Sequence, residues 1–164
     1  MKISSMEHSD LVCRADKWLK SQGWKVVIND NFRAYVHNGE QPDVIAWRDG
    51  VSILIECKVS RADFLKDKKK RFRQESSKGM GNWRFYFCPP GIIEVNDLPY
   101  GWGLLWANPK TIKKVHGYPS NCHWHFKKPF QACLASENMM LVSALRRFAV
   151  RGQLDSIYEK RSEK

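Results

Sequence analysis

The chain has 164 residues, 43% of them hydrophobic, which is typical of a globular protein with a buried core and excludes a disordered chain. Its 28 basic residues outnumber 17 acidic ones, and the resulting net charge of +11 favours a polyanionic partner, most commonly nucleic acid. No apolar run approaches the roughly 20 residues of a membrane span, and the first residues lack the apolar segment of a secretory signal, so we expect no membrane association.

The first predicted element is a helix over residues 5–20. Apolar residues recur there at helical spacing, and Gly23 follows as a stop signal. Ser4-x-x-Glu7 matches a capping box, in which the Glu7 side chain bonds back to the Ser4 amide. The apolar stripe consists of Leu11, Val12, Ala15, Trp18 and Leu19.

A short strand is predicted over residues 24–28, where β-branched residues gather. Residues 29–40 read as a loop that ends in a turn at 37–39, although residues 32–36 could also pair as a strand edge.

Residues 42–58 are predicted to form a β-hairpin, because Asp49-Gly50 separates two apolar, β-branched runs. A two-residue turn sets the register by counting. The opposed pairs are then Arg48 and Val51, Ala46 and Ile53, Val44 and Ile55, and Asp43 and Glu56.

This register brings two carboxylates together at one end of the hairpin. Directly opposed Cβ atoms lie about 4.5–5.5 Å apart, and Lys58 shares the face of Glu56 because side chains alternate along a strand. Two carboxylates at that separation call for a cation or a raised pKa, and Mg²⁺ or Mn²⁺ suits oxygen ligands. The alternative is an ordinary solvated hairpin end, which the uninterrupted apolar run 53–55 disfavours.

Pro42-Asp43, followed on the next strand by Glu56-Cys57-Lys58, resembles the PD-(D/E)xK nuclease superfamily, and the resemblance spans about residues 5–90. It implies an α/β fold with a restriction-endonuclease-like core: a helix, three antiparallel strands, a helix and a parallel strand. The mixed central sheet would be flanked by helices, and a C-terminal helix would be added to it.

The resemblance also implies a site. Asp43, Glu56 and the backbone carbonyl of Cys57 would hold Mg²⁺, with Mn²⁺ as a substitute, and Lys58 would assist the attacking water. Many members carry an acidic residue on the first helix that completes the metal site. Glu7 is the best-placed match and Asp10 is the rival, while the capping role of Glu7 stays open.

A basic helix is predicted over residues 61–75, capped by Ser60 and burying Phe64, Leu65 and Phe72. Residues 58–84 contain ten basic and three acidic residues, whereas a solvated helix face usually mixes signs. A merely soluble basic helix is the alternative. The residues expected to bind nucleic acid are Ser60, Arg61, Lys66, Lys69, Lys70 and Arg73.

The second half of the chain is predicted to add strands over 83–88, 103–107 and 111–116, the first of them parallel to the hairpin because a helical crossover precedes it. In the irregular segment 118–130, Trp124, Phe126, Lys127 and Lys128 could either stack on a nucleic-acid strand or pack on the sheet. Ser136 is predicted to cap a final helix reaching about Val150, whose apolar side holds Leu141, Leu145, Phe148 and Ala149.

Five cysteines without a C-x-x-C pair predict reduced thiols and a cytoplasmic protein. The run Cys122-His123-Trp124-His125 matches no standard zinc spacing, so zinc is not expected there.

We therefore expect one nuclease-like domain over 1–164, with a core of about 5–116, a C-terminal loop and helix over 117–152, and a frayed tail over 153–164. The expected function is a Mg²⁺-dependent endonuclease that hydrolyses phosphodiester bonds in DNA. The alternative is a nucleic-acid-binding module on the same fold with weak or no catalysis. An RNA substrate, the preference for single-stranded, duplex or branched DNA, the number of metal ions, a homodimer and the biological pathway stay open.

Overall fold

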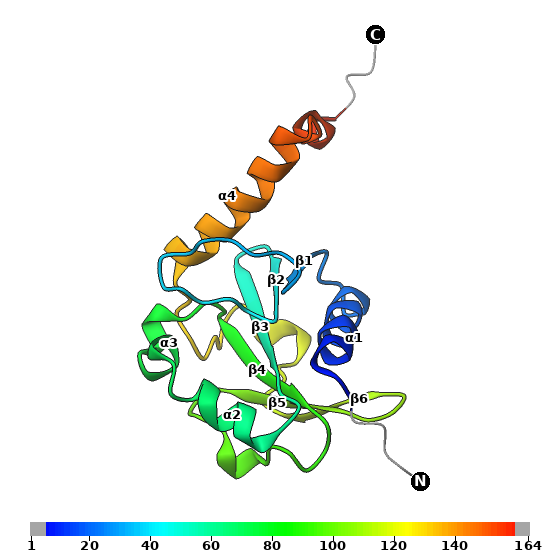
Figure 1. Cartoon of the computed structure of the whole chain (residues 1–164), viewed down its shortest axis with the longest axis vertical. Coiled ribbons are helices and arrows are strands. Elements are labelled where there is room, and N and C mark those ends of the chain that lie inside the picture. Colours follow the sequence, from blue (N-terminus) through cyan, green and yellow to red (C-terminus); the bar gives the residue numbers. More distant parts are fainter. Residues whose placement is uncertain (1–5, 160–164) are drawn as a thin grey trace.

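A computed structural model describes residues 6–159 and is built around one six-stranded sheet in the order β1-β2-β3-β4-β5-β6 (Figure 1). The pairs β3–β4 and β4–β5 are parallel and the others are antiparallel, which confirms the expected mixed sheet. The strands are β1 (Val26–Asn29), β2 (Val44–Arg48), β3 (Val51–Cys57), β4 (Trp83–Cys88), β5 (Gly103–Ala107) and β6 (Ile112–His116).

The β2–β3 hairpin has the predicted register, with Val44 opposite Ile55 and Arg48 opposite Val51. Gly50 in the turn has a φ of 72°, a left-handed conformation that glycine adopts without steric cost. All seven residues of β3 are buried, so both faces of this strand are covered. Alternate residues belong to two separate apolar cores: Ile53 and Ile55 contribute to one, Leu54 to the other.

Helix α1 (His8–Ser21) covers one face of the sheet and packs its Leu11 and Leu19 into the first core. The second core, on the other face, receives Phe64 from α2 (Arg61–Asp67) and Met140 from α4 (Leu134–Val150). The remaining helical segments are short: α3 (Arg71–Gln74), η1 (Ser76–Lys78), η2 (Val95–Asp97), η3 (Asn121–His123) and η4 (Leu154–Ile157).

Two predicted elements of the first half differ in the structure. The helix predicted over 61–75 is broken into α2 and α3, because the chain turns at residues 68–70. Residues 32–36 form no strand, in agreement with the predicted loop and not with its strand-edge alternative. The first helix begins at His8, and Glu7 is its N-cap; Ser4, the predicted capping residue, lies outside the described residues.

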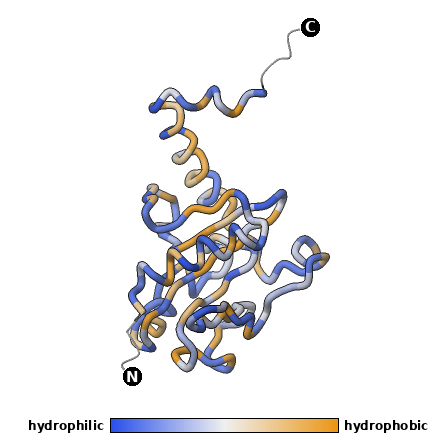
Figure 2. Tube along the Cα trace, turned by 90° about the vertical axis from the view of Figure 1, so that its right-hand side faces the viewer, coloured by the Kyte–Doolittle hydropathy of each residue, from blue (hydrophilic) through white to orange (hydrophobic). Residues whose placement is uncertain are grey.

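Helix α4 also differs from its prediction. It begins at Leu134 after an N-cap at Cys133, so Ser136 lies inside the first turn and is not the cap. The helix then leaves the body of the protein (Figure 1), and hydrophobic residues lie along it (Figure 2). Leu145 and Phe148, expected to be buried, are half-exposed. Neither α4 nor any other helix within residues 6–159 is long and apolar enough to cross a membrane.

Candidate active site

The candidate site lies at the end of β3, in the middle of the sheet. Glu56 is the penultimate residue of β3 and Lys58 follows the strand; both are buried. The Lys58 backbone N–H donates to the Phe87 carbonyl of β4 (2.9 Å), so the parallel pairing holds this segment in place. A buried carboxylate and a buried ammonium are costly unless they are paired, so both groups must have partners of opposite charge in the interior.

Asp43 lies just before β2 and is tied to the strand that carries Glu56. Its Oδ2 accepts the backbone N–H of Cys57 (2.7 Å), while the pairing of β2 with β3 begins one residue later, at Val44. The Cys57 side chain is buried in the first core, as the alternation of the strand predicts. Burial raises the pKa of this thiol well above its usual value, so the side chain stays neutral.

Two further residues approach Asp43 that sequence reasoning missed, His8 and Asp30. His8 Nε2 lies 3.3 Å from Asp43 Oδ1, and His8 Nδ1 lies 3.9 Å from Asp30 Oδ2. Within residues 6–159, these three side chains form the one group of metal-ligand type, with donor atoms all within 4.8 Å of one another. The hydrogen bond to Asp43 raises the pKa of His8, against the effect of burial. The position of His8 next to Glu7 was the only signal in the sequence.

Glu7 and Asp10, the acidic candidates of the first helix, have a capping geometry. The Glu7 backbone N–H donates to Asp10 Oδ2 (3.4 Å), which completes a capping box three residues away from the one predicted with Ser4. Glu7 is exposed. The turn that they stabilise presents His8, the first residue of α1, to Asp43.

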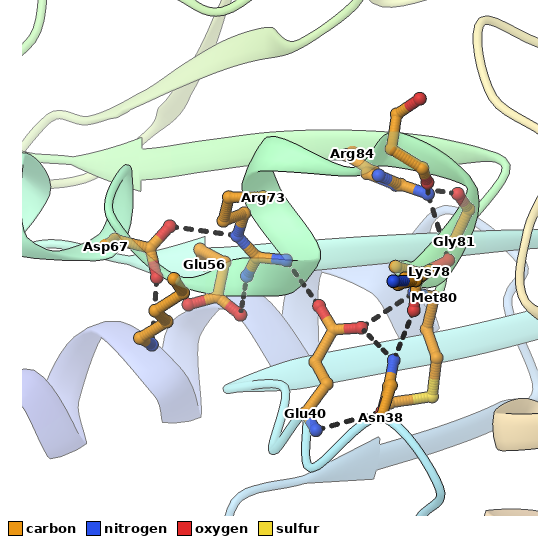
Figure 3. A network of polar contacts seen from close by, with 12 residues as sticks. Asn38, Glu40, Glu56, Asp67, Arg73, Lys78, Met80, Gly81 and Arg84 are labelled. Atoms are coloured by element: carbon orange, nitrogen blue, oxygen red, sulfur yellow. Dashed lines mark hydrogen bonds and ion pairs between the residues drawn. The ribbon is translucent and has the colours of Figure 1, made fainter.

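Glu56 is held between two cations. Its Oε2 lies 3.2 Å from Lys58 Nζ. Its Oε1 lies 2.8 Å from Arg73 Nη2 (Figure 3). Burial raises the pKa of Glu56 to about 7; the Arg73 and Lys58 cations oppose this rise, and the Asp43 carboxylate adds to it. A group in this state readily exchanges a proton for a metal ion at neutral pH.

Arg73 corrects a prediction. Sequence reasoning assigned it to an exposed, DNA-contacting face, but its side chain is only 2% exposed. The guanidinium contacts the carboxylates of Glu40, Glu56 and Asp67, which come from three separate segments (Figure 3). Arg73 therefore belongs to the interior of the site and not to a surface that binds phosphates.

The other residues predicted to bind nucleic acid are at the surface, in different states. Ser60 caps α2 by accepting the Asp63 N–H (3.2 Å). Arg61 makes two 2.6 Å bonds to Asp97. Lys66, Lys69 and Lys70 are exposed, although Lys70 Nζ also lies 2.9 Å from Asp67 Oδ1.

In the segment 118–130, one of the four residues considered packs in the core, and the other three are at the surface. Trp124 is buried and packs edge-on against Trp24 and Trp83, so it belongs to the core. Phe126 is 84% exposed, and Lys127 and Lys128 are exposed as well. These three are at the surface and could meet a nucleic-acid strand, although the Lys128 ammonium also donates to the Gly50 carbonyl.

The donors at the site suit a hard divalent cation. Carboxylate oxygens predominate, with one imidazole, and this combination suits Mg²⁺ or Mn²⁺. Glu56 Oε1 is buried and has Arg73 Nη2 as its ion-pair partner at 2.8 Å, without hydrogen-bond geometry. Four carboxylates surround the site: those of Glu40, Glu56 and Asp67 are buried and pair with Arg73, and that of Asp43 contacts His8.

Comparisons with known proteins bear on the family resemblance and the fold. A family model described as archaeal Holliday junction resolvase (Hjc) matches residues 14–77, which include Asp43, Glu56 and Lys58. The match covers less than half of the chain, and it confirms the resemblance to the PD-(D/E)xK nuclease superfamily. No curated protein matches the chain.

One similar solved structure is the SPO1766 protein of unknown function from Silicibacter pomeroyi. It is 20% identical, with a TM-score of 0.56 over 99% of this chain and 100% of that chain. At this identity the likeness concerns the fold alone.

Proposed function

We propose that this chain, which belongs to the PD-(D/E)xK nuclease superfamily, is a divalent-metal-dependent endonuclease that hydrolyses phosphodiester bonds in DNA. The main support is the convergence of Asp43, Glu56 and Lys58 at the end of β3, where each is held by further charged or polar groups. A protein that only bound nucleic acid would gain nothing from burying Glu56 and Lys58 beside Asp43.

Asp43 and Glu56 would hold Mg²⁺, together with the carbonyl oxygen of Cys57. His8 is a further candidate ligand because it already contacts Asp43, and Glu7 remains a candidate for a second ion. A bound Mg²⁺ would supply Lewis-acid polarisation of the phosphate and a more acidic attacking water.

Lys58 has an electrostatic role in this proposal. Burial lowers the pKa of its ammonium, but Glu56, Asp67 and Asp43 more than compensate, so the pKa is raised and the side chain stays charged. A permanently charged ammonium is a poor general base. Lys58 would instead donate to the scissile phosphate or orient the water, where negative charge develops in the transition state.

The exposed lysines of α2 and the following turn would contact the DNA backbone. Lys66, Lys69 and Lys70 lie on the segment that directly follows Lys58 and the site. Such contacts contribute affinity and salt dependence but carry no sequence information. A four-way DNA junction is the first substrate to test, because the matched family model is named for resolvases of that structure.

The test is a cleavage assay on labelled single-stranded, duplex and four-way-junction DNA and on matching RNA, with Mg²⁺, Mn²⁺ or EDTA. We expect cleavage of at least one DNA substrate with metal, none with EDTA, and none by Asp43→Asn. Lys20→Gln, which removes the ion pair between an exposed lysine and Asp16 on α1, serves as the control and should cleave. Equal cleavage by Asp43→Asn, or in EDTA, would reject the proposal; binding without cleavage would favour the binding-module alternative.

A further inference from the structure

The carboxylate of Asp67 lies beside the catalytic trio, and its place is set by Arg73. Arg73 Nε lies 3.0 Å from Asp67 Oδ2, while Nη2 of the same planar guanidinium lies 2.8 Å from Glu56 Oε1 (Figure 3). Nη1 contacts Glu40, which holds the guanidinium from a third side. All four side chains are at most 2% exposed. Asp67 and Glu56 therefore sit at a spacing fixed by one rigid group.

Lys58 is shared between these two carboxylates. Its Nζ lies 3.2 Å from Glu56 Oε2 and 3.5 Å from Asp67 Oδ1. The Lys58 side chain is 5% exposed, so an ammonium that left Glu56 would find little water. Because an unpaired buried charge is strongly unfavourable, Lys58 needs a second acid whenever Glu56 is engaged elsewhere.

Metal binding would create that need. Arg73 lies on Glu56 Oε1, so the oxygen best placed to reach a cation beside Asp43 is Oε2. This oxygen is the partner of the Lys58 ammonium in the structure. A divalent cation and an ammonium on the same oxygen repel each other strongly in a buried site.

We propose that Asp67 is a positioning residue that takes over the Lys58 ammonium when a divalent cation binds Glu56. The inference rests on the proposed metal-dependent function. Lys58 then stays beside the site, in reach of a phosphate, instead of competing with the ion.

Other contacts fit Asp67 for this role. The Tyr86 hydroxyl donates to Oδ2 (2.8 Å), which leaves Oδ1 to meet Lys58. Lys70 also reaches Oδ1, at 2.9 Å, but its side chain is 46% exposed and can be solvated instead. Burial alone would raise the pKa of Asp67, yet Arg73 and Lys58 hold it below its usual range, so Asp67 is a carboxylate at neutral pH.

The test measures Mn²⁺ binding to the full chain by titration calorimetry, without DNA. Asp67→Asn should weaken Mn²⁺ affinity about 10–100-fold, the loss typical of groups that orient metal ligands. Glu137→Gln is the matched control, since it neutralises another buried carboxylate that contacts neither Lys58 nor Arg73. Its affinity should stay within about twofold of the wild type.

A double-mutant cycle separates a handover of Lys58 from a general loss of negative charge. In a Lys58→Met background there is no ammonium to relocate, so adding Asp67→Asn should change Mn²⁺ affinity less than about threefold. The same large loss in both backgrounds would overturn the proposal. So would an unchanged affinity in Asp67→Asn alone.

Tyr86→Phe keeps the experiment decisive if Asp67→Asn does not fold. It removes the hydroxyl that orients Asp67 and leaves every charge in place. A loss of about two- to fivefold in Mn²⁺ affinity that vanishes in the Lys58→Met background supports the proposal, and no loss contradicts it. If the wild type itself binds no Mn²⁺, the metal-dependent function fails, which is a result distinct from failure of the Asp67 inference.

Discussion

Two buried glutamates, Glu137 and Glu56, lie at opposite ends of the β2–β3 hairpin, and their side chains have different kinds of partner. Glu137, near the Asp49-Gly50 turn, accepts hydrogen bonds from Ser52 Oγ (2.7 Å), the Gly81 N–H (2.9 Å) and Trp47 Nε1 (3.0 Å), all neutral donors. Glu56, at the other end, faces two cations and has an oxygen with no hydrogen bond from residues 6–159.

The difference separates a structural carboxylate from a reactive one. Each donor to Glu137 belongs to a different segment, so the carboxylate joins β2, β3, the start of β4 and α4. Its negative charge is stabilised by three fixed hydrogen-bond donors, so the carboxylate needs no cation. Glu56 is balanced by the charged side chains of Lys58 and Arg73, and a raised pKa marks it as a group that can change partner. Burial alone does not distinguish the two.

The largest expected effect is on cleavage. Glu56→Gln should reduce the single-turnover rate at saturating Mg²⁺ at least about 10³-fold, equivalent to about 4 kcal/mol, because a neutral amide holds a metal ion poorly. Glu137→Gln should cleave at nearly the wild-type rate. Its rate is divided by the fraction of folded protein, so that a loss of stability is not counted as a loss of activity. Comparable losses of cleavage rate in both variants would mean that Glu56 is no more reactive than Glu137.

Lys58→Ala should come next. We expect a loss of about 10²–10³-fold in the rate, the size seen when one donor to a developing charge is removed. DNA affinity should change little, because Lys58 is one of 28 basic residues and is buried. Rates over a DNA titration separate the two quantities. Weak binding with a normal rate at saturation would assign Lys58 to binding instead.

The raised pKa of Glu56 predicts a pH dependence of stability in the metal-free protein. Between about pH 4.5 and 7 the folded chain keeps a proton on Glu56 that the unfolded chain has lost, so this group lowers the free energy of unfolding as pH rises through that window. The decrease should reach about 3 kcal/mol relative to Glu56→Gln. Urea unfolding in EDTA at several pH values measures it. A constant difference between the two proteins would contradict the assignment.

Glu137 should matter for stability at a fixed pH. In Glu137→Gln the amide group would turn a donor toward one of the three N–H or O–H groups, so we expect a loss of about 2 kcal/mol in the free energy of unfolding. Ser52→Ala, which removes one donor to Glu137 and the acceptor of the Asn82 N–H, should cost about 1–2 kcal/mol. Urea midpoints at pH 7.5 give both values, and unchanged midpoints would mean that Glu137 does not join these segments.

The smallest effect concerns exposed cations. Replacing Lys66, Lys69 and Lys70 with Ala should flatten the slope of log K against log salt by up to about 2.7 for duplex DNA, since each phosphate contact contributes about 0.9. The control replaces Lys110, Lys113 and Lys114 near β6, which removes the same charge from another surface. If the control flattens the slope and the α2 variant does not, DNA binds elsewhere, and the exposed Phe126 to Lys128 segment becomes the better candidate.

Local sequence patterns determined much of the fold. The Asp49-Gly50 turn and the two-residue repeat of β2 and β3 predicted their register, and the bounds of β4 and β5 match their apolar runs. The PD-(D/E)xK resemblance indicated the site at the end of β3, since Glu56 lies on this strand and Lys58 directly follows it, two residues further along the chain. Such features depend on neighbouring residues in one hairpin, which the sequence presents directly.

Only the tertiary structure decided which partners these residues meet. A run of basic residues looks alike whether its members face solvent or the interior, and Arg73 turns inward because Glu40, Glu56 and Asp67 converge there from distant segments. His8 reaches Asp43 only because α1 packs against the sheet. The chemistry of a residue can be read from its type, but its charge balance depends on groups that are close in space and far apart in the chain.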